Sequence, residues 1–170
     1  MDVIGVAHYT TGFAVVAAIY AIFSLGLNIH WGYTGLFNIG IAGFFALGAY
    51  TSALLTTAQP DPLLFEDFKF GGNLPDTLGA ANLSVDLWFP VALLAAGAVC
   101  GVVALGIGLI TLRLREDYLA IATLGIAESV RLVFLNEKWL ANGSKGLYRI
   151  PKFLGDAVSP QNYDYLYLVV

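Results

Sequence analysis

The chain has 170 residues, of which 58% are apolar and 12% are charged, and its formal net charge is −4. Its mean hydropathy is +0.76. This composition excludes an ordinary soluble domain, which carries about twice that share of charged residues, and no basic patch points to nucleic acid. We therefore expect membrane lipid to surround much of the chain.

Residues 3–60 contain no charged side chain. A hydrocarbon core of about 30 Å needs roughly 20 apolar residues in a helix, so this region predicts two membrane spans, 12–28 and 33–55, with a break near 28–32. The residues before the first span lack the basic side chains of a secretory signal peptide and are interpreted as mature sequence.

The start of the second predicted span is rich in glycine. Each glycine weakens a continuous helix by about 1 kcal/mol relative to alanine, and Gly32, Gly35 and Gly40 lie close together. Residues 32–40 are therefore predicted to form a broken or re-entrant piece of helix. The amides that such a break exposes can bind a carboxylate without any charged side chain.

This break supplies candidates for a translocation pathway, which are Asn28, Tyr33, Thr34, Gly35 and Asn38. The two asparagines have two possible roles. Their side chains can satisfy backbone groups that the break leaves free, or they can offer hydrogen bonds to a substrate.

An acidic stretch, 61–86, precedes a third charge-free span at 87–112. Cys100 within this span is interpreted as a small packing residue. Small residues follow one face of the predicted helix at spacings typical of a close contact between membrane helices. The sequence therefore predicts a packing seam formed by Gly97, Gly101, Ala104 and Gly108.

A short polar turn follows the third span and is predicted to lie in the cytoplasm. It contains Arg113, Arg115, Glu116 and Asp117. The two acidic residues are expected to begin the next helix, because the dipole of a helix favours negative charge at its N-terminus.

The fourth predicted span, 118–135, contains Glu128 and Arg131. Charged residues at membrane depth are costly and usually face a bundle interior or a wet cavity. Their i,i+3 spacing allows the two side chains to pair on one helix face. The pair either only neutralises itself, or it takes part in gating or lines the pathway.

Residues 136–164 are polar and rich in turn formers, and residues 165–170 resemble the start of a further span. The sequence thus predicts an all-α, polytopic membrane helix bundle that forms a single transmembrane domain over 1–170. Because the chain ends where a helix should begin, we expect it to be truncated at the C-terminus.

The charges give conflicting indications of orientation. Basic residues mark cytoplasmic loops, which places the acidic stretch 61–86 outside and Arg113 with Arg115 inside. If 118–135 crosses the membrane, however, the basic loop 136–164 emerges outside. Charge counting alone favours a segment 118–135 that lies along the membrane or folds back.

The sequence contains no signature of an enzyme. It has no paired metal-ligand spacing and no Gly-x-Ser-x-Gly, and residues 143–146 lack the order of a phosphate-binding loop. We expect no catalytic residue, no metal and no cofactor on this chain. If ATP is used, another chain binds it.

Three segments of the chain together resemble one known family. The first is Trp31-Gly32-Tyr33-Thr34-Gly35-Leu36-Phe37-Asn38-Ile39-Gly40, preceded by Leu27-Asn28 and followed by Gly48-Ala49-Tyr50-Thr51. The second joins Leu112-Arg113-Leu114-Arg115 to Asp117-Tyr118-Leu119-Ala120-Ile121-Ala122-Thr123-Leu124-Gly125 and Glu128-Ser129-Val130-Arg131-Leu132. The third is Asn142-Gly143-Ser144-Lys145-Gly146-Leu147 with Ile150-Pro151. In this order they resemble the branched-chain amino acid ABC transporter permeases, and most of all their M-type membrane subunit.

The resemblance implies a multi-pass subunit of the inner membrane that takes up neutral or branched-chain amino acids. It implies as partners a homologous permease, two cytoplasmic ATPases and an extracytoplasmic substrate-binding protein, with ATP hydrolysed on the ATPases. It also implies that 118–135 crosses the membrane, and on this point we follow the resemblance rather than the charge count.

The sequence departs from the family pattern in two places. Family members often carry a polar residue at the position of Ile41, and no segment before Val170 matches their ATPase-docking helix. The chain therefore resembles only the N-terminal half of a permease, and alone it should not transport. The alternatives are the similar permease of a urea or short-amide importer and a membrane assembly subunit that does not transport.

Overall fold

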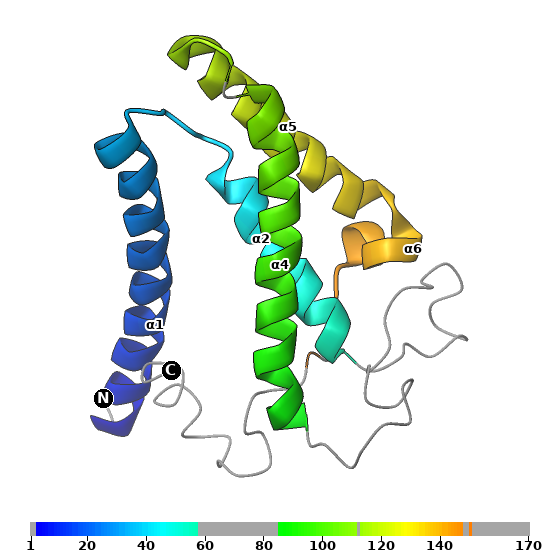
Figure 1. The fold of residues 1–170 in the computed structure, drawn as a ribbon. Helices are drawn as coiled ribbons and strands as arrows, with labels where there is room; N and C mark the ends of the chain where they lie inside the picture. Colours follow the sequence, from blue (N-terminus) through cyan, green and yellow to red (C-terminus); the bar gives the residue numbers. More distant parts are fainter. Residues whose placement is uncertain (1–2, 58–84, 112, 148–149, 151–170) are drawn as a thin grey trace. The chain divides into compact units, whose positions relative to one another are not determined.

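The computed structural model describes residues 3–57, 85–111, 113–147 and 150, and every regular element among them is helical (Figure 1). This confirms the predicted all-α membrane bundle. The chain divides into two compact units, one built on residues 1–36 and the other on residues 37–153. The acidic stretch 61–84, most of the basic loop beyond residue 147 and the predicted start of a span at 165 lie outside the described residues.

The first unit contains the long helix α1 (Val3–Asn28), which continues into a π-helical turn (Ile29–Tyr33). The helix extends beyond the predicted span 12–28 at its start, and the π turn extends it beyond residue 28. Thr10 and Thr11 lie inside this helix, and their hydroxyl groups donate to the carbonyl of Ala7 one turn earlier. A threonine that bonds to its own helix in this way is compatible with a helix interior.

The second unit begins with a short non-helical link and helix α2 (Ile41–Thr56). Helix α2 begins eight residues after the start of the predicted span 33–55 (41 − 33). The glycine-rich stretch 32–40 does contain non-helical residues, at 35–38. They link two separate helices, and a broken or re-entrant span at this place stays a prediction.

Two further long helices follow the sequence-based bounds closely. Helix α4 (Val85–Thr111) compares with the predicted 87–112, and helix α5 (Glu116–Asn136) compares with 118–135. The short helix α6 (Lys138–Ala141) and a 3₁₀ turn (Gly143–Lys145) come next. Asn142 joins these two short pieces in a left-handed conformation, with φ 61°.

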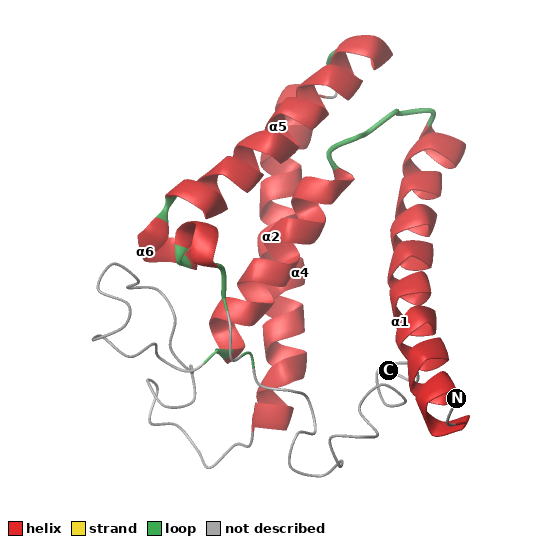
Figure 2. Cartoon of the chain, turned by 180° about the vertical axis from the view of Figure 1, so that it is seen from behind, coloured by secondary structure: helices red, strands yellow, loops and turns green. Residues whose placement is uncertain are grey.

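In the second unit, α2 contacts both α4 and α5 (Figure 2). Small side chains make the contacts close: Ala92 and Ala96 of α4 are buried, as is Ala53 of α2. Farther along, the rings of Tyr50 and Phe134 stack with their centroids 4.2 Å apart. The helices therefore touch through small residues and one aromatic pair.

Three helical stretches have the length and apolar composition to cross a membrane, namely Val6–Tyr33, Trp88–Thr111 and Asp117–Asn136. Helix α2 is apolar but has only 16 residues, which is about 24 Å at 1.5 Å per residue. It is shorter than the hydrocarbon core of a typical bilayer.

Candidate functional site

The end of the first helix is built around Thr34 and Gly35. Gly35 has φ 70° and its amide donates to the carbonyl of Trp31 at 3.1 Å. The amide of Leu36 donates to the carbonyl of His30 at 3.2 Å, and the hydroxyl of Thr34 also donates to this carbonyl. A glycine in the left-handed region is the usual way to end a helix, so Gly35 has a defined conformational role.

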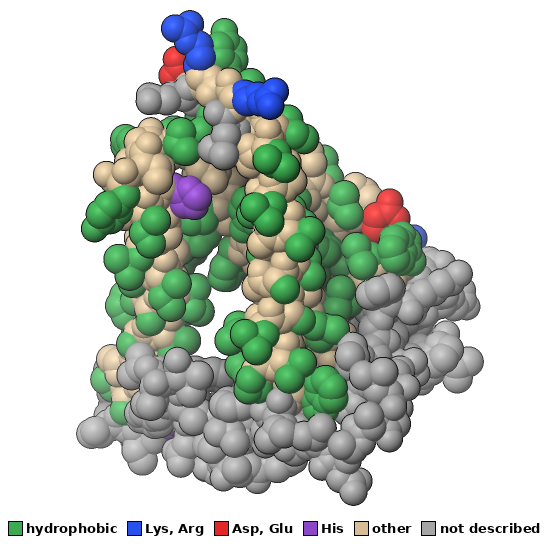
Figure 3. Space-filling view, viewed as in Figure 1, with side chains coloured by type: hydrophobic (Ala, Val, Ile, Leu, Met, Phe, Trp, Pro, Cys, Tyr) green, Lys and Arg blue, Asp and Glu red, His purple; other side chains and the backbone are tan. Residues whose placement is uncertain are grey.

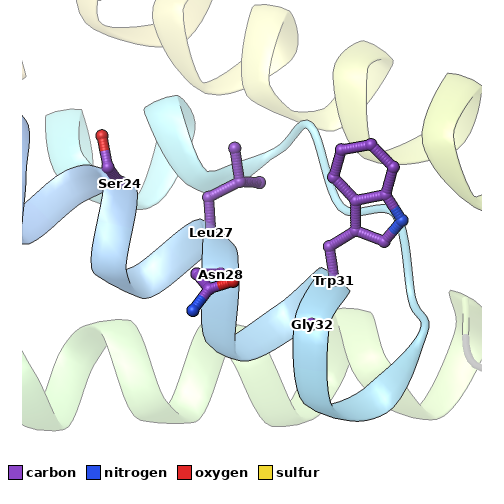
Figure 4. A pocket seen from close by; sticks show the side chains of 5 residues that line it. All are labelled: Ser24, Leu27, Asn28, Trp31 and Gly32. Atoms are coloured by element: carbon purple, nitrogen blue, oxygen red, sulfur yellow. The ribbon is translucent and has the colours of Figure 1, made fainter.

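Asn28 lies one turn before this helix end, beside an open hollow of about 320 Å³ (Figure 4). In this view the side chains of Ser24, Leu27 and Trp31 point to the same side of the helix, and Asn28 lies next to Gly32. A Cβ at Gly32 would come within 2.8 Å of Asn28 Oδ1. The asparagine therefore uses the space that the glycine leaves. Tyr33, the next residue, is 84% exposed.

Asn38 lies at the start of the second unit, where the chain enters α2. Its Oδ1 accepts a hydrogen bond from the amide of Gly40 at 2.8 Å. This supports the first of the two roles considered for the asparagines, the satisfaction of a backbone group next to a helix start.

Thr123 of α5 lies at the same place, and the sequence analysis did not select it. Its hydroxyl accepts from the amide of Ile39 at 3.2 Å and donates to the carbonyl of Ala120 at 3.1 Å. The residue is only 4% exposed. A single polar residue within an apolar stretch of helix was the signal that could have indicated it.

Glu128 and Arg131 form the ion pair that their spacing predicts, with Oε1 and Nη1 2.6 Å apart. Both side chains are more than half exposed within this chain. Glu128 follows the first residue of α5 by 12 positions (128 − 116), which is about 18 Å along the helix. In a helix that crosses the membrane, such a pair needs protein or water beside it rather than lipid.

The predicted packing seam on α4 is not the face that touches α2. A Cβ built at Gly97 or Gly101 meets nothing within 4 Å among the described residues. The observed contact runs along a neighbouring face, where the Cys100 thiol lies 3.6 Å from the carbonyl of Phe44. The packing role of Gly97, Gly101, Ala104 and Gly108 stays a prediction.

The polar turn between α4 and α5 is present where the sequence predicts it. Arg113, Arg115 and Asp117 are exposed, and α5 begins at Glu116 as expected. Figure 3 shows the basic and acidic side chains gathered at this end of the two helices, while apolar side chains cover much of the helical surface below.

The candidate residues thus form separate groups. Asn28, Tyr33, Thr34 and Gly35 share the end of the first helix, whereas Asn38 shares the start of α2 with Thr123. Glu128 and Arg131 lie on an exposed face of α5, one to two turns beyond the buried Thr123. The arrangement offers amides, hydroxyls, carboxamides and one ion pair, and among the described residues there is no cluster able to hold a metal ion.

Comparison with known families gives a match over nearly the whole chain. The family described as "Branched-chain amino acid transport system / permease component" matches residues 9–166. No solved structure matches.

The chain is also similar to curated relatives from bacteria and an archaeon. It is 36% identical over 147 residues to the high-affinity branched-chain amino acid transport system permease protein LivM of Escherichia coli, and equally to that of Salmonella typhimurium. These alignments cover 86% of the chain and 28% of each relative. The probable branched-chain amino acid permease LivM of Methanocaldococcus jannaschii is 30% identical over 126 residues, which is 68% of the chain and 35% of the relative. The chain therefore spans about a third or less of the length of the relatives it matches.

Proposed function

Since the chain belongs to the family of permease components of branched-chain amino acid transport systems, we propose that it forms part of an ABC importer permease for branched-chain or other neutral amino acids. The proposal depends chiefly on the family match over residues 9–166. The three long apolar helices agree with the multi-pass membrane protein that such a permease is.

The proposed partners follow from an importer of this kind. A homologous permease subunit would complete the membrane part, and two ATPase subunits in the cytoplasm would bind and hydrolyse ATP. A substrate-binding protein outside would deliver the amino acid. In this assembly the chain has no catalytic site of its own, and it lies in the inner (plasma) membrane.

The proposed pathway element is the end of the first helix, at Tyr33, Thr34 and Gly35. Its support is chemical: an amino acid carries an ammonium group, and the C-terminal end of a helix leaves carbonyl groups that can accept hydrogen bonds from it. Asn28 and Asn38 flank this element in the sequence. Glu128 with Arg131 is the second proposed pathway group, because a charged pair at membrane depth needs polar surroundings.

Uptake by the complete transporter tests the function. The full-length permease, its partner permease, ATPases and binding protein are expressed in cells that lack their own branched-chain uptake, and entry of labelled leucine is measured. We expect ATP-dependent uptake that unlabelled valine and isoleucine inhibit. Inhibition by urea or acetamide instead would overturn the amino acid substrate. An assembled complex that imports none of these would favour the non-transporting assembly subunit.

A single variant tests the pathway element. Gly35→Leu places a side chain at φ 70°, which costs about 1–2 kcal/mol, and fills the proposed conduit. We expect leucine uptake to fall at least roughly tenfold, because 1.4 kcal/mol already corresponds to a factor of ten. The matched control is Gly12→Leu in the same unit, since a Cβ at Gly12 meets nothing within 4 Å. Unchanged uptake by Gly35→Leu at normal expression would count against the conduit.

A further inference from the structure

The start of α2 is tied to α5 through one side chain. The amide of Ile39 donates to Thr123 Oγ1 at 3.2 Å, across 84 positions of sequence. The same hydroxyl donates to the carbonyl of Ala120 at 3.1 Å. A threonine hydroxyl has one proton to donate and can accept two, so both bonds form together and fix its orientation.

The two helices also approach closely at this point. A Cβ at Gly40 would lie 2.9 Å from the carbonyl oxygen of Thr123, and a Cβ at Gly43 would lie 2.8 Å from the Cα of Ala127. Neither position has room for a side chain without movement of backbone. Small residues allow this kind of contact between membrane helices, so α2 and α5 meet here in a single close-fitting register.

The amides next to the helix start are satisfied in two ways. The amide of Gly40 is bonded within its own segment, to Asn38 Oδ1 at 2.8 Å. The amide of Ile39 is bonded to another helix, through Thr123. In the hydrocarbon region an amide without a partner is strongly unfavourable, and therefore the hydroxyl of Thr123 has a specific task that a methyl group cannot perform.

We infer that Thr123 is a positioning residue, which holds the Asn38–Gly40 segment in fixed register on α5 and thereby fixes the place of the pathway candidate Asn38. This inference rests on the proposed function for its consequence in transport, but the positioning itself does not. Any movement of α2 along α5 breaks the bond between Thr123 and Ile39, so the segment and α5 move together or separate in one step.

Thr123→Val tests the inference in the complete transporter, because valine keeps the branched shape and removes the hydroxyl. We expect the rate of leucine uptake to fall roughly tenfold at a normal amount of protein in the membrane, the loss anticipated when a buried amide is left without a partner. Thr123→Ser keeps the hydroxyl and should retain most of the rate.

The matched control is Thr56→Val. Thr56 is buried like Thr123, at 6% exposed, but among the described residues its hydroxyl donates only to carbonyls of its own helix, those of Ser52 and Ala53. Valine there should leave uptake unchanged. If Thr123→Ser is as impaired as Thr123→Val, the methyl group rather than the hydroxyl is important and the inference is overturned.

A second measurement does not depend on transport. Ile39→Cys in a Cys100→Ala background reports on the segment, because Ile39 is 36% exposed and contributes only its amide to the bond. We expect a water-soluble maleimide to label this cysteine several-fold faster when Thr123→Val is added, and at the original rate with Thr123→Ser. Equal labelling rates in all three proteins would overturn the positioning role. A transporter that fails to import amino acids but shows this labelling difference would refute only the proposed function.

Discussion

The first helix and the second unit are both apolar, yet they differ in how much of their apolar surface is buried. Among the described residues, the apolar 18-residue window of the first helix contains no buried residue, whereas 22% of the corresponding window of α5 is buried. Among the three candidate spans, α5 is the least hydrophobic. Lipid tails are as apolar as leucine, so apolar character alone does not bring membrane helices together. Small residues and interhelical hydrogen bonds do, and α5 has both in Thr123 and Ala127.

Gly43→Leu should have the largest effect, because it disrupts the contact between α2 and α5. A Cβ at Gly43 already lies 2.8 Å from the backbone of Ala127, and an overpacked contact between rigid backbones can cost more than about 3 kcal/mol. We expect little folded protein on size-exclusion chromatography of detergent-solubilised membranes. Gly125→Leu is the control on α5, because a Cβ there meets nothing within 4 Å. Equal amounts of folded protein from both variants would show that α2 and α5 do not depend on a close approach.

The ion pair is a second difference between α5 and the first helix, because α1 and its π turn contain no Asp, Glu, Lys or Arg. Glu128→Gln or Arg131→Gln alone leaves one unpaired charge in the membrane, which we expect to cost about 3 kcal/mol. The double variant should recover most of the folded protein. Thermal unfolding in detergent measures the stability, and uptake measures function. A double variant that folds but does not transport would support a pathway role. Single variants as stable as the unchanged protein would show that water surrounds the ion pair.

Asn38→Ala should have the smallest effect of the three. It removes the acceptor of a local hydrogen bond from the Gly40 amide, and loss of one such bond costs about 1 kcal/mol. For a chain of this size we expect the melting temperature to fall by roughly 3 °C. Asn38→Asp keeps an acceptor at the same place and should retain this hydrogen bond. A larger loss of uptake than of stability would instead indicate that the carboxamide contacts the substrate.

Prediction from sequence worked best where charges delimit the helices. Helix α4 lies between acidic residues and the arginines of the polar turn, and α5 begins at the acidic end of that turn, so both sets of bounds were close. Residues 3–60 contain no charged residues that could delimit a helix in this way. There the end of the first helix and the start of α2 depend on local hydrogen bonds, which hydropathy does not reveal: those of Gly35 and Leu36 after the π turn, and that of Asn38 before α2.

The candidate site was predictable only in part. Gly35 and the pair of Glu128 and Arg131 follow from local rules, since a left-handed glycine and an i,i+3 pair need no knowledge of distant residues. Thr123 could not be found in this way, because its partner Ile39 lies 84 positions away in the chain. Among the described residues, Gly40 and Gly43 bring the start of α2 close to the backbone of α5, a contact that the local sequence does not indicate, and the packing role of the small residues on α4 stays a prediction.

The π-helical turn Ile29–Tyr33 has a consequence for sequence changes at the end of α1. A π turn accommodates one residue more than an α-helical turn. Deleting one residue within it would allow the α-helix to continue unbroken with the later residues of that unit in nearly the same orientation, because the π turn holds the extra residue. The same deletion in the α-helical part would instead rotate Thr34 and Gly35 about the axis by roughly 100°, the rotation of one α-helical step.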